Sequence, residues 1–285
     1  MKKSSKAFGI LLFAAAVVLW PGPAALAQGK FEFSGHYGRW SVNIFKSMIE
    51  SAIGDALETE FRDKLVENAQ QDNPLFQLTR YHQVVRFDSG GPDYGFELRW
   101  YPSGEYGSFS LGFAYEKTTM KIGFPEVAVD LALEDQGTGQ GGSMTADVHG
   151  EFLMKPAAVL VSFRWDLFPR GRFHPYITFG LGMAGGSALD EGRLSYGYTA
   201  DLISPDTNEH YEEEVSKTLR ELKAEMESEI DPETGEPKEF SLPNFLPFLQ
   251  LHLGMKFTIV RRVQAFIDYG ILDGFLLRAG LAVRF

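Results

Sequence analysis

Hydrophobic and polar residues alternate along much of the chain. The segment FELRWYP, residues 96–102, alternates bulky apolar side chains with Glu97 and Arg99, and the terminal segment LLRAGLAVRF, residues 276–285, alternates up to its last residue. Successive side chains of a β-strand point to opposite sides, so this pattern predicts strands with one apolar and one polar face. The alternating segments follow one another in pairs separated by short turns, which is typical of β-hairpins.

About eight such strands are predicted, at residues 31–45, 94–102, 108–116, 157–169, 175–184, 248–260, 264–272 and 276–285. Three links between them are short, at 103–107, 169–174 and 261–263, and three are long, at about 46–92, 125–146 and 187–244. If the strands run alternately up and down, these three short links fall at one end and the three long links at the other. This asymmetry is typical of a transmembrane barrel.

The segment FQLTRYHQVVRF, residues 76–87, also alternates, and it has two possible interpretations. It is either a separate strand that turns at DSGGPD, or an extension of the second strand beyond the membrane. A separate strand makes the strand count odd and puts long links at both ends. We therefore expect the extension.

The polar phase of the strands indicates which face points inward. In a barrel of eight strands, side chains just fill the interior, whereas each Arg or Lys exposed to lipid at the mid-plane would cost about 2–4 kcal/mol. Buried charges are tolerated mainly when they are paired, so we expect a charge network that plugs the lumen while the apolar phase faces lipid. The predicted network has four acidic and five basic members, Glu97, Arg99, Glu116, Arg164, Asp166, Lys256, Asp268, Arg278 and Arg284.

Aromatic residues gather beside the short turns. Such a cluster predicts an interfacial girdle, because aromatic side chains are enriched where a barrel meets the membrane surface. The expected members are Trp100, Tyr101, Tyr106, Trp165, Phe168, Phe173, Tyr176 and Phe285.

The N-terminal segment has the features of a secretory signal. MKKSSK is positively charged, a shorter apolar run than the roughly 20 residues of a spanning helix follows, and Ala25-Leu26-Ala27 offers a signal peptidase site. We expect residues 1–27 to be a removed signal peptide and residues 28–285 to form the barrel domain. The chain has no cysteine, which excludes disulfides and cysteine-ligated metals.

Together these segments resemble a known group. The signal peptide, the alternating strands, ELRWYPS before one turn, RWDLFPRGRFHPYITFGLG around the next and the ending AVRF resemble the small outer-membrane β-barrel family that includes OmpA-, OmpX- and OmpW-like proteins. The resemblance covers about half of the chain, namely its strands. It implies a closed barrel in the bacterial outer membrane, and a last strand with Phe285 that is the recognition signal for the barrel-assembly machinery.

The long links at about 46–92 and 187–244 carry helical patterns. Apolar residues recur at helical spacing in 48–69 and in 209–230, and such a stripe has to be buried. Two outcomes are open: the helices pair with each other or with the barrel rim as a cap on the outer mouth, or they are solvated acidic loops with transient helicity. Residues 187–244 contain sixteen acidic and five basic residues, so this link alone has the net charge of −11 that the whole chain has.

Catalytic, metal and cofactor patterns are weak in this sequence. The best candidate is His149 with Glu151, and proximity in sequence alone is weak evidence of a site; His252 lies in the lumen phase, where a hydrogen-bonded interior histidine is expected. We therefore expect no enzymatic activity, no cofactor and no metal, and the acidic charge argues against nucleic acid as a partner. Outer-membrane lipids are the expected surroundings, and the sequence names no extracellular ligand.

These observations predict an all-β fold: an antiparallel transmembrane barrel of about eight strands with helical insertions in its extracellular loops. The expected function is surface-structural or loop-mediated binding by a barrel with a plugged lumen. Two alternatives are a narrow channel for small or apolar solutes and a secreted soluble β-barrel binding protein, whose apolar face would lie inside.

Overall fold

The computed structural model describes residues 31–104, 107–185, 191–205, 207–228, 245–272 and 274–285. The predicted signal peptide, residues 1–27, lies outside these ranges. No helix in the described part of the chain is long and apolar enough to cross a membrane.

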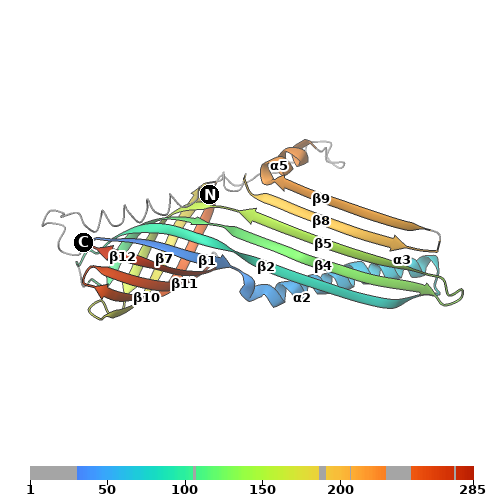
Figure 1. Cartoon of the computed structure of the whole chain (residues 1–285), viewed down its shortest axis with the longest axis horizontal. Helices are drawn as coiled ribbons and strands as arrows, with labels where there is room; N and C mark the ends of the chain where they lie inside the picture. The colour runs from blue at the N-terminus through green and yellow to red at the C-terminus, as the bar shows by residue number, and fades with distance from the viewer. Residues whose placement is uncertain (1–30, 105–106, 186–190, 206, 229–244, 273) are drawn as a thin grey trace, which may run out of the picture.

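Eight antiparallel strands close into a barrel (Figure 1). Their order around the wall is β1, β12, β11, β10, β7, β6, β3 and β2, and a direct pairing of β1 with β2 closes the ring. This confirms the prediction of about eight strands. The strands are β1 (Phe31–Ser41), the C-terminal part of β2 (Phe76–Trp100), β3 (Phe109–Thr118), β6 (Ala157–Asp166), β7 (Phe173–Gly185), β10 (Phe245–Val260), β11 (Val263–Ile271) and β12 (Phe275–Arg284).

Strand β2 continues beyond the barrel into a second region, which we call the extension sheet. Residues 76–90 of β2 pair with β4 (Met120–Asp135), and β5 (Gly141–Met154), β8 (Arg193–Ile203) and β9 (Asn208–Thr218) follow in order. This five-stranded antiparallel sheet projects from one end of the barrel (Figure 1). The prediction that residues 76–87 prolong the second strand is therefore confirmed.

Three short links lie at one end of the barrel and the long links at the other, as predicted, whereas the short link between β11 and β12 lies at the end with the long links. The short links β2–β3, β6–β7 and β10–β11 lie at the end away from the extension sheet, where the C-terminus also lies (Figure 1). The chain between β3 and β6 and the chain between β7 and β10 enter the extension sheet. The described parts of the long links at 125–146 and 187–244 are thus mostly strand, and these four additional strands were not predicted.

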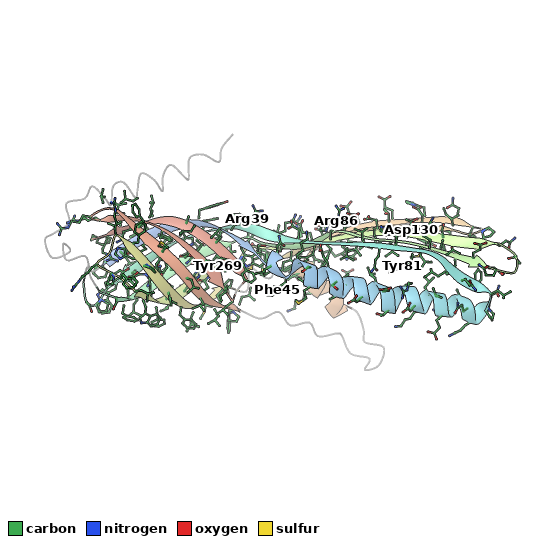
Figure 2. The ribbon with its side chains drawn as sticks, turned by 90° about the horizontal axis from the view of Figure 1, so that it is seen from below. Arg39, Phe45, Tyr81, Arg86, Asp130 and Tyr269 are labelled. Carbon is green, nitrogen blue, oxygen red and sulfur yellow. The ribbon has the colours of Figure 1, made fainter. Side chains whose placement is uncertain are left out.

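One predicted helix is present and lies along a face of the extension sheet (Figure 2). It runs from a 3-10 turn, η2 (Asn43–Phe45), through α2 (Lys46–Ala56) and a π-helical segment, η3 (Leu57–Asp63), to α3 (Lys64–Asp72). The carboxylate of Glu50 accepts a hydrogen bond of 2.8 Å from the Phe87 backbone N–H, and Gln83 donates one of 3.2 Å to the Gly54 carbonyl. The helix therefore packs against β2 and not over the barrel mouth.

The prediction of a second helix, over residues 209–230, is wrong for the first half of that range. Residues 208–218 form β9, and the helix α5 (Leu219–Ser228) begins only after it. Tyr211 and Val215 are four residues apart, so they share a face in a helix and also in a strand. Pairing with β8, which places Tyr211 opposite Ala200 and Val215 opposite Tyr196, selects the strand.

The proposed pairing of the two helices as a cap is not what the described residues show. Helices α2 and α3 pack mainly on β2, whereas α5 packs on β9, and β2 and β9 are opposite edges of the extension sheet (Figure 1). Residues 229–244, which complete the predicted acidic loop, lie outside the described ranges.

Candidate functional site

All nine residues of the predicted charge network lie inside the barrel. None of them is more than 8% exposed, and Arg99 and Lys256 are each 1% exposed. Residues of the other phase point outward: Phe113 and Leu281 are each 57% exposed, and Leu253 is 56% exposed. This distribution is the inverse of a soluble barrel, in which the apolar face would be inside.

Glu32 is the centre of the network near the short-turn end. Its carboxylate accepts hydrogen bonds from Lys256 at 2.7 and 2.9 Å, from Arg284 at 2.8 Å and from the Tyr101 hydroxyl at 3.0 Å. Arg164 approaches the same carboxylate at 3.4 Å. One buried carboxylate thus interacts with three cations, and its single negative charge offsets only part of theirs.

A second cluster lies around Glu97. Its carboxylate accepts from both Arg99 and Arg164, with the Arg164 contact at 3.3 Å, and also from the Ser162 hydroxyl. Arg99 additionally donates to the Ser110 hydroxyl at 3.1 Å. Glu97 thus joins β2 to β6 across β3, which places the Arg164 side chain where it contacts both acidic centres.

The third cluster is centred on Arg278, nearer the extension sheet. The Arg278 guanidinium donates to Asp268 at 2.9 Å and to Glu116, and Gln250 donates to the other Glu116 oxygen at 2.8 Å. His252 is 1% exposed and lies 3.2 Å from Asp268 and 3.1 Å from the Gln250 side chain. The prediction of a hydrogen-bonded interior histidine is confirmed.

Two predicted girdle residues are inside the lumen instead, which corrects the sequence interpretation. Tyr101 and Tyr176 are 0% and 2% exposed, and the Tyr176 hydroxyl donates a 2.7 Å hydrogen bond to Asp268. The Arg284 guanidinium lies 4.0 Å from the centroid of the Tyr101 ring, and that of Arg164 lies 4.3 Å from the Tyr176 centroid. Their rings therefore serve as cation–π surfaces for the charge network.

Gly254 makes room for the Tyr176 ring. The two residues are paired between β10 and β7, and a Cβ atom at position 254 would lie 2.2 Å from Cζ of Tyr176. Such a separation is far below van der Waals contact, so any larger residue there has to displace the ring. At this position of the polar phase, packing of the neighbouring ring therefore requires a glycine.

Four other predicted girdle residues are exposed, as expected. Trp100, Trp165, Phe168 and Phe173 are 43–65% exposed and lie at the short-turn end. Phe285 stacks on Phe31 with ring centroids 6.4 Å apart. Tyr106 lies outside the described residues.

The network has members that the sequence interpretation missed. Glu32 and Asp93 are both 0% exposed, and His36 joins them in the lumen. The alternation of polar and apolar residues already identifies them. Glu32 and His36 alternate with apolar residues in FEFSGHYG, and Asp93 has the same phase as Glu97 and Arg99. With these additions, the described residues place six acidic and five basic side chains in the lumen.

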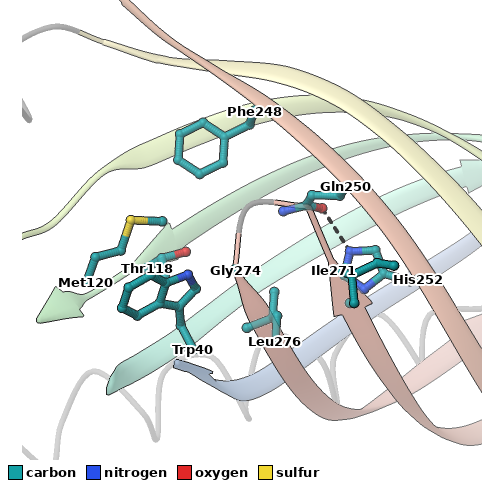
Figure 3. A pocket seen from close by; sticks show the side chains of 10 residues that line it. Trp40, Thr118, Met120, Phe248, Gln250, His252, Ile271, Gly274 and Leu276 are labelled. Atoms are coloured by element: carbon teal, nitrogen blue, oxygen red, sulfur yellow. Dashed lines mark hydrogen bonds between the residues drawn. The ribbon is translucent and has the colours of Figure 1, made fainter. Parts of the chain in front are cut away.

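Side chains fill the lumen. One cavity of about 20 Å³ lies among His36, Glu116 and Arg278, and another of about 10 Å³ lies at the mouth, beneath Trp40 (Figure 3). A single water molecule needs about 10–15 Å³ measured in this way. The two cavities therefore hold no more than a water or two.

The structure also locates the catalytic candidates, a possible metal-binding group and a surface groove. His149 is exposed on β5, and the carboxylate of Glu151 pairs with Lys121. Among the described residues, one group has metal-ligand atoms that converge: His36, Asp93 and Glu116. A groove of about 380 Å³ lies at the tip of the extension sheet, between α3, β4, β5 and β8.

No family model matches the sequence, and no characterised protein matches it either. Among solved structures, the chain is similar to the translocator domain of the autotransporter NalP from Neisseria meningitidis, with 8% identity over 99% of this chain and 96% of that chain and a TM-score of 0.24. It is also similar to the transport unit of the autotransporter AIDA-I from Escherichia coli, with 9% identity over 95% of each chain and a TM-score of 0.22. Scores this low carry no functional argument.

Proposed function

We propose that this chain is a non-enzymatic outer-membrane protein whose eight-stranded barrel is plugged and whose extension sheet projects from the cell surface. The observation that carries the proposal is the inverted barrel: a network of six acidic and five basic side chains is inside, and large apolar side chains are outside. In water this arrangement would expose the apolar face, whereas in a bilayer the same face is buried.

The dimensions of the barrel support a membrane location. Several wall strands are 9–11 residues long, among them β1, β3, β6, β11 and β12. This length matches the 9–11 residues that a tilted strand needs to cross the hydrocarbon core. The exposed Trp100, Trp165, Phe168 and Phe173 at one end of the wall support an interfacial ring there.

The packed lumen supports a structural or binding role over transport. Arg164, Lys256 and Arg278 each reach across the lumen to acidic residues on other strands. Opening a path for solutes would separate these buried pairs, and each broken pair costs about 3–5 kcal/mol. We therefore regard a narrow channel as the less favoured of the two functions.

The extension sheet supports a role at the cell surface. It has two different faces, one of which packs on the helix from Lys46 to Asp72 (Figure 2). The other carries cross-strand ion pairs, Arg80–Asp130 at 2.9 Å and Arg86–Glu126 at 3.0 Å. Its tip has the apolar groove lined by residues such as Phe76 and Leu133, which is our candidate contact region for an extracellular ligand.

The position of the last strand supports the proposal that the barrel-assembly machinery inserts this protein. The backbone of Phe285 exchanges two hydrogen bonds with that of Phe31, at 3.0 and 2.8 Å, so β12 closes the barrel against β1 up to its final residue. We propose that this strand, with Phe285, is the assembly signal.

Fractionation and conductance together test the proposal. We expect the protein in the outer-membrane fraction, with a gel mobility that changes on heating, and we expect purified protein to give no steady single-channel current in a planar bilayer. External protease on intact cells should cleave the extension sheet and leave the barrel protected. Recovery in the aqueous fraction would exclude the membrane location, and steady conductance would favour the channel.

A further inference from the structure

We infer that His36, Asp93 and Glu116 form a binding site for one divalent transition-metal ion of the Zn²⁺ type inside the barrel lumen. The three residues come from three consecutive strands of the wall, β1, β2 and β3. This site is independent of whatever ligand the extension sheet binds.

Strand register brings the three side chains together. His36 is paired with Gly95 on β2, and Gly95 is paired with Glu116 on β3, so the histidine and the glutamate flank a glycine. A Cβ atom at position 95 would lie 2.9 Å from Cε1 of His36 and 3.0 Å from Cγ of Glu116. Asp93 lies two residues before Gly95, on the same face of β2. The glycine thus leaves the space into which its neighbours point.

The spacing of the ligand atoms suits a small cation. Nε2 of His36 is 3.2 Å from Oδ2 of Asp93 and 3.9 Å from Oε1 of Glu116, and all three atoms lie within 4.8 Å of one another. Zinc binds imidazole nitrogen and carboxylate oxygen at about 2.0–2.2 Å, and tetrahedral geometry then separates neighbouring ligands by about 3.4 Å. One nitrogen and two oxygens leave the fourth position for water.

The hydrogen bonds around the site leave two of the three converging atoms available, and the third, Oε1 of Glu116, also accepts a hydrogen bond from Arg278. Nε2 of His36 and Oδ2 of Asp93 are buried and have no hydrogen-bond partner with acceptable geometry. The other Asp93 oxygen accepts from Thr118 at 2.7 Å, and the other Glu116 oxygen accepts from Gln250 at 2.8 Å. Such outer contacts orient ligands around a metal, and buried polar atoms without partners are uncommon in native structures.

Charge in the lumen is divided unevenly, which also favours a cation at this site. Among the described residues, the half near the extension sheet contains three carboxylates, Asp93, Glu116 and Asp268, against one guanidinium, Arg278, so their net charge is −2 when the histidines are neutral. The other half has three acidic and four basic residues, Glu32, Glu97, Asp166, Arg99, Arg164, Lys256 and Arg284, and a net charge of +1. A divalent ion at His36 would neutralise the excess. The competing explanation is a protonated His36 that simply pairs with Asp93.

The mouth of the barrel closes over the site. Trp40 lies four residues after His36 on the same face of β1, is 5% exposed and lines the small cavity at the mouth together with Thr118 (Figure 3). A bound ion would therefore exchange slowly, and metal has to be supplied while the protein folds.

The test is the metal content of folded, tag-free protein. The full mature chain is refolded into detergent micelles with ZnCl2, treated with EDTA, separated from free metal and analysed by mass spectrometry, and the heat-modifiable gel band reports folding. We expect one Zn²⁺ per wild-type chain, and at least about tenfold less in His36→Gln and in the isosteric Asp93→Asn. His252→Gln, a buried lumen histidine outside the cluster, is the matched control and should keep the ion.

Two results would overturn the site. Folded wild-type protein without zinc would show that His36 and Asp93 form an ion pair only. Equal zinc in folded Asp93→Asn and wild type would show that the metal binds elsewhere. As a second measurement, refolding with zinc should raise the unfolding temperature of wild type and of His252→Gln, and leave that of Asp93→Asn unchanged.

Discussion

The Nζ atom of Lys256 lies 2.7 Å from Oε1 of Glu32, although 224 positions separate the two residues in the sequence. Lys256 is on β10 and Glu32 on β1, with β11 and β12 between them in the wall. The contact therefore crosses the lumen and forms only when the sheet curls around it. Charge pairing and barrel closure are coupled in this protein, and the following predictions depend on that coupling.

Replacing Glu32 by Gln should strongly destabilise the barrel. The change leaves Lys256, Arg284 and Arg164 without their shared carboxylate, and removing one partner of a buried pair costs about 3–5 kcal/mol. Urea unfolding of the heat-modifiable form measures the loss. Glu126→Gln, which removes an exposed pair with Arg86, is the control and should cost about 0–1 kcal/mol. Equal effects of the two variants would contradict the central role of Glu32.

Replacing Gly254 by Ala should destabilise the barrel by displacing Tyr176. The new methyl group would lie 2.2 Å from Cζ of the ring, and overpacking of this kind costs about 1–3 kcal/mol. Thermal unfolding measures the cost. Gly35→Ala is the matched control, because its nearest neighbour would be 3.9 Å away, and this variant should unfold like wild type. A Gly254→Ala protein as stable as wild type would show that the ring is free to move.

An arginine introduced on an exposed apolar position should lower stability only where that position faces lipid. Leu253 is 56% exposed in the middle of the barrel part of β10, and Leu253→Arg should lose about 2–4 kcal/mol of stability in lipid vesicles. Ile203 is 49% exposed on β8 of the extension sheet, and Ile203→Arg should have little effect there. If both variants fold into vesicles equally well, the apolar belt does not face lipid.

The β8–β9 pairing should weaken with rising pH. Nδ1 of His210 lies 2.7 Å from Oδ1 of Asp201, and this hydrogen bond, together with the aspartate charge, raises the pKa of His210 above its ordinary value. A raised pKa in the folded state stabilises fully below the unfolded histidine value, near 6.5, and the stabilisation is lost as the pH rises through the folded value. An NMR titration of the His210 ring should show the raised pKa, and Asp201→Asn should lower it. An unchanged pKa in that variant would rule out Asp201 as the cause.

Much of the barrel could be predicted from the sequence because alternation is a local property. A residue two positions from Glu97 must share its face, so Arg99 is in the lumen whatever its partners are. The cost of placing charges in lipid then decides which face is inside. The same reasoning applied to FEFSGHYG would have found Glu32 and His36.

The sequence by itself determined the period of the strands, the inward charges and the placement of three short links and three long links at opposite ends. Only the tertiary structure decided which charge meets which, that the long links form a sheet, and that residues 208–218 are a strand. The reason is that partners across the lumen depend on the register of a closed sheet, which no local pattern specifies. The spacing of Tyr211 and Val215 fits a helix and a strand equally, and pairing with the neighbouring β8 selects the strand.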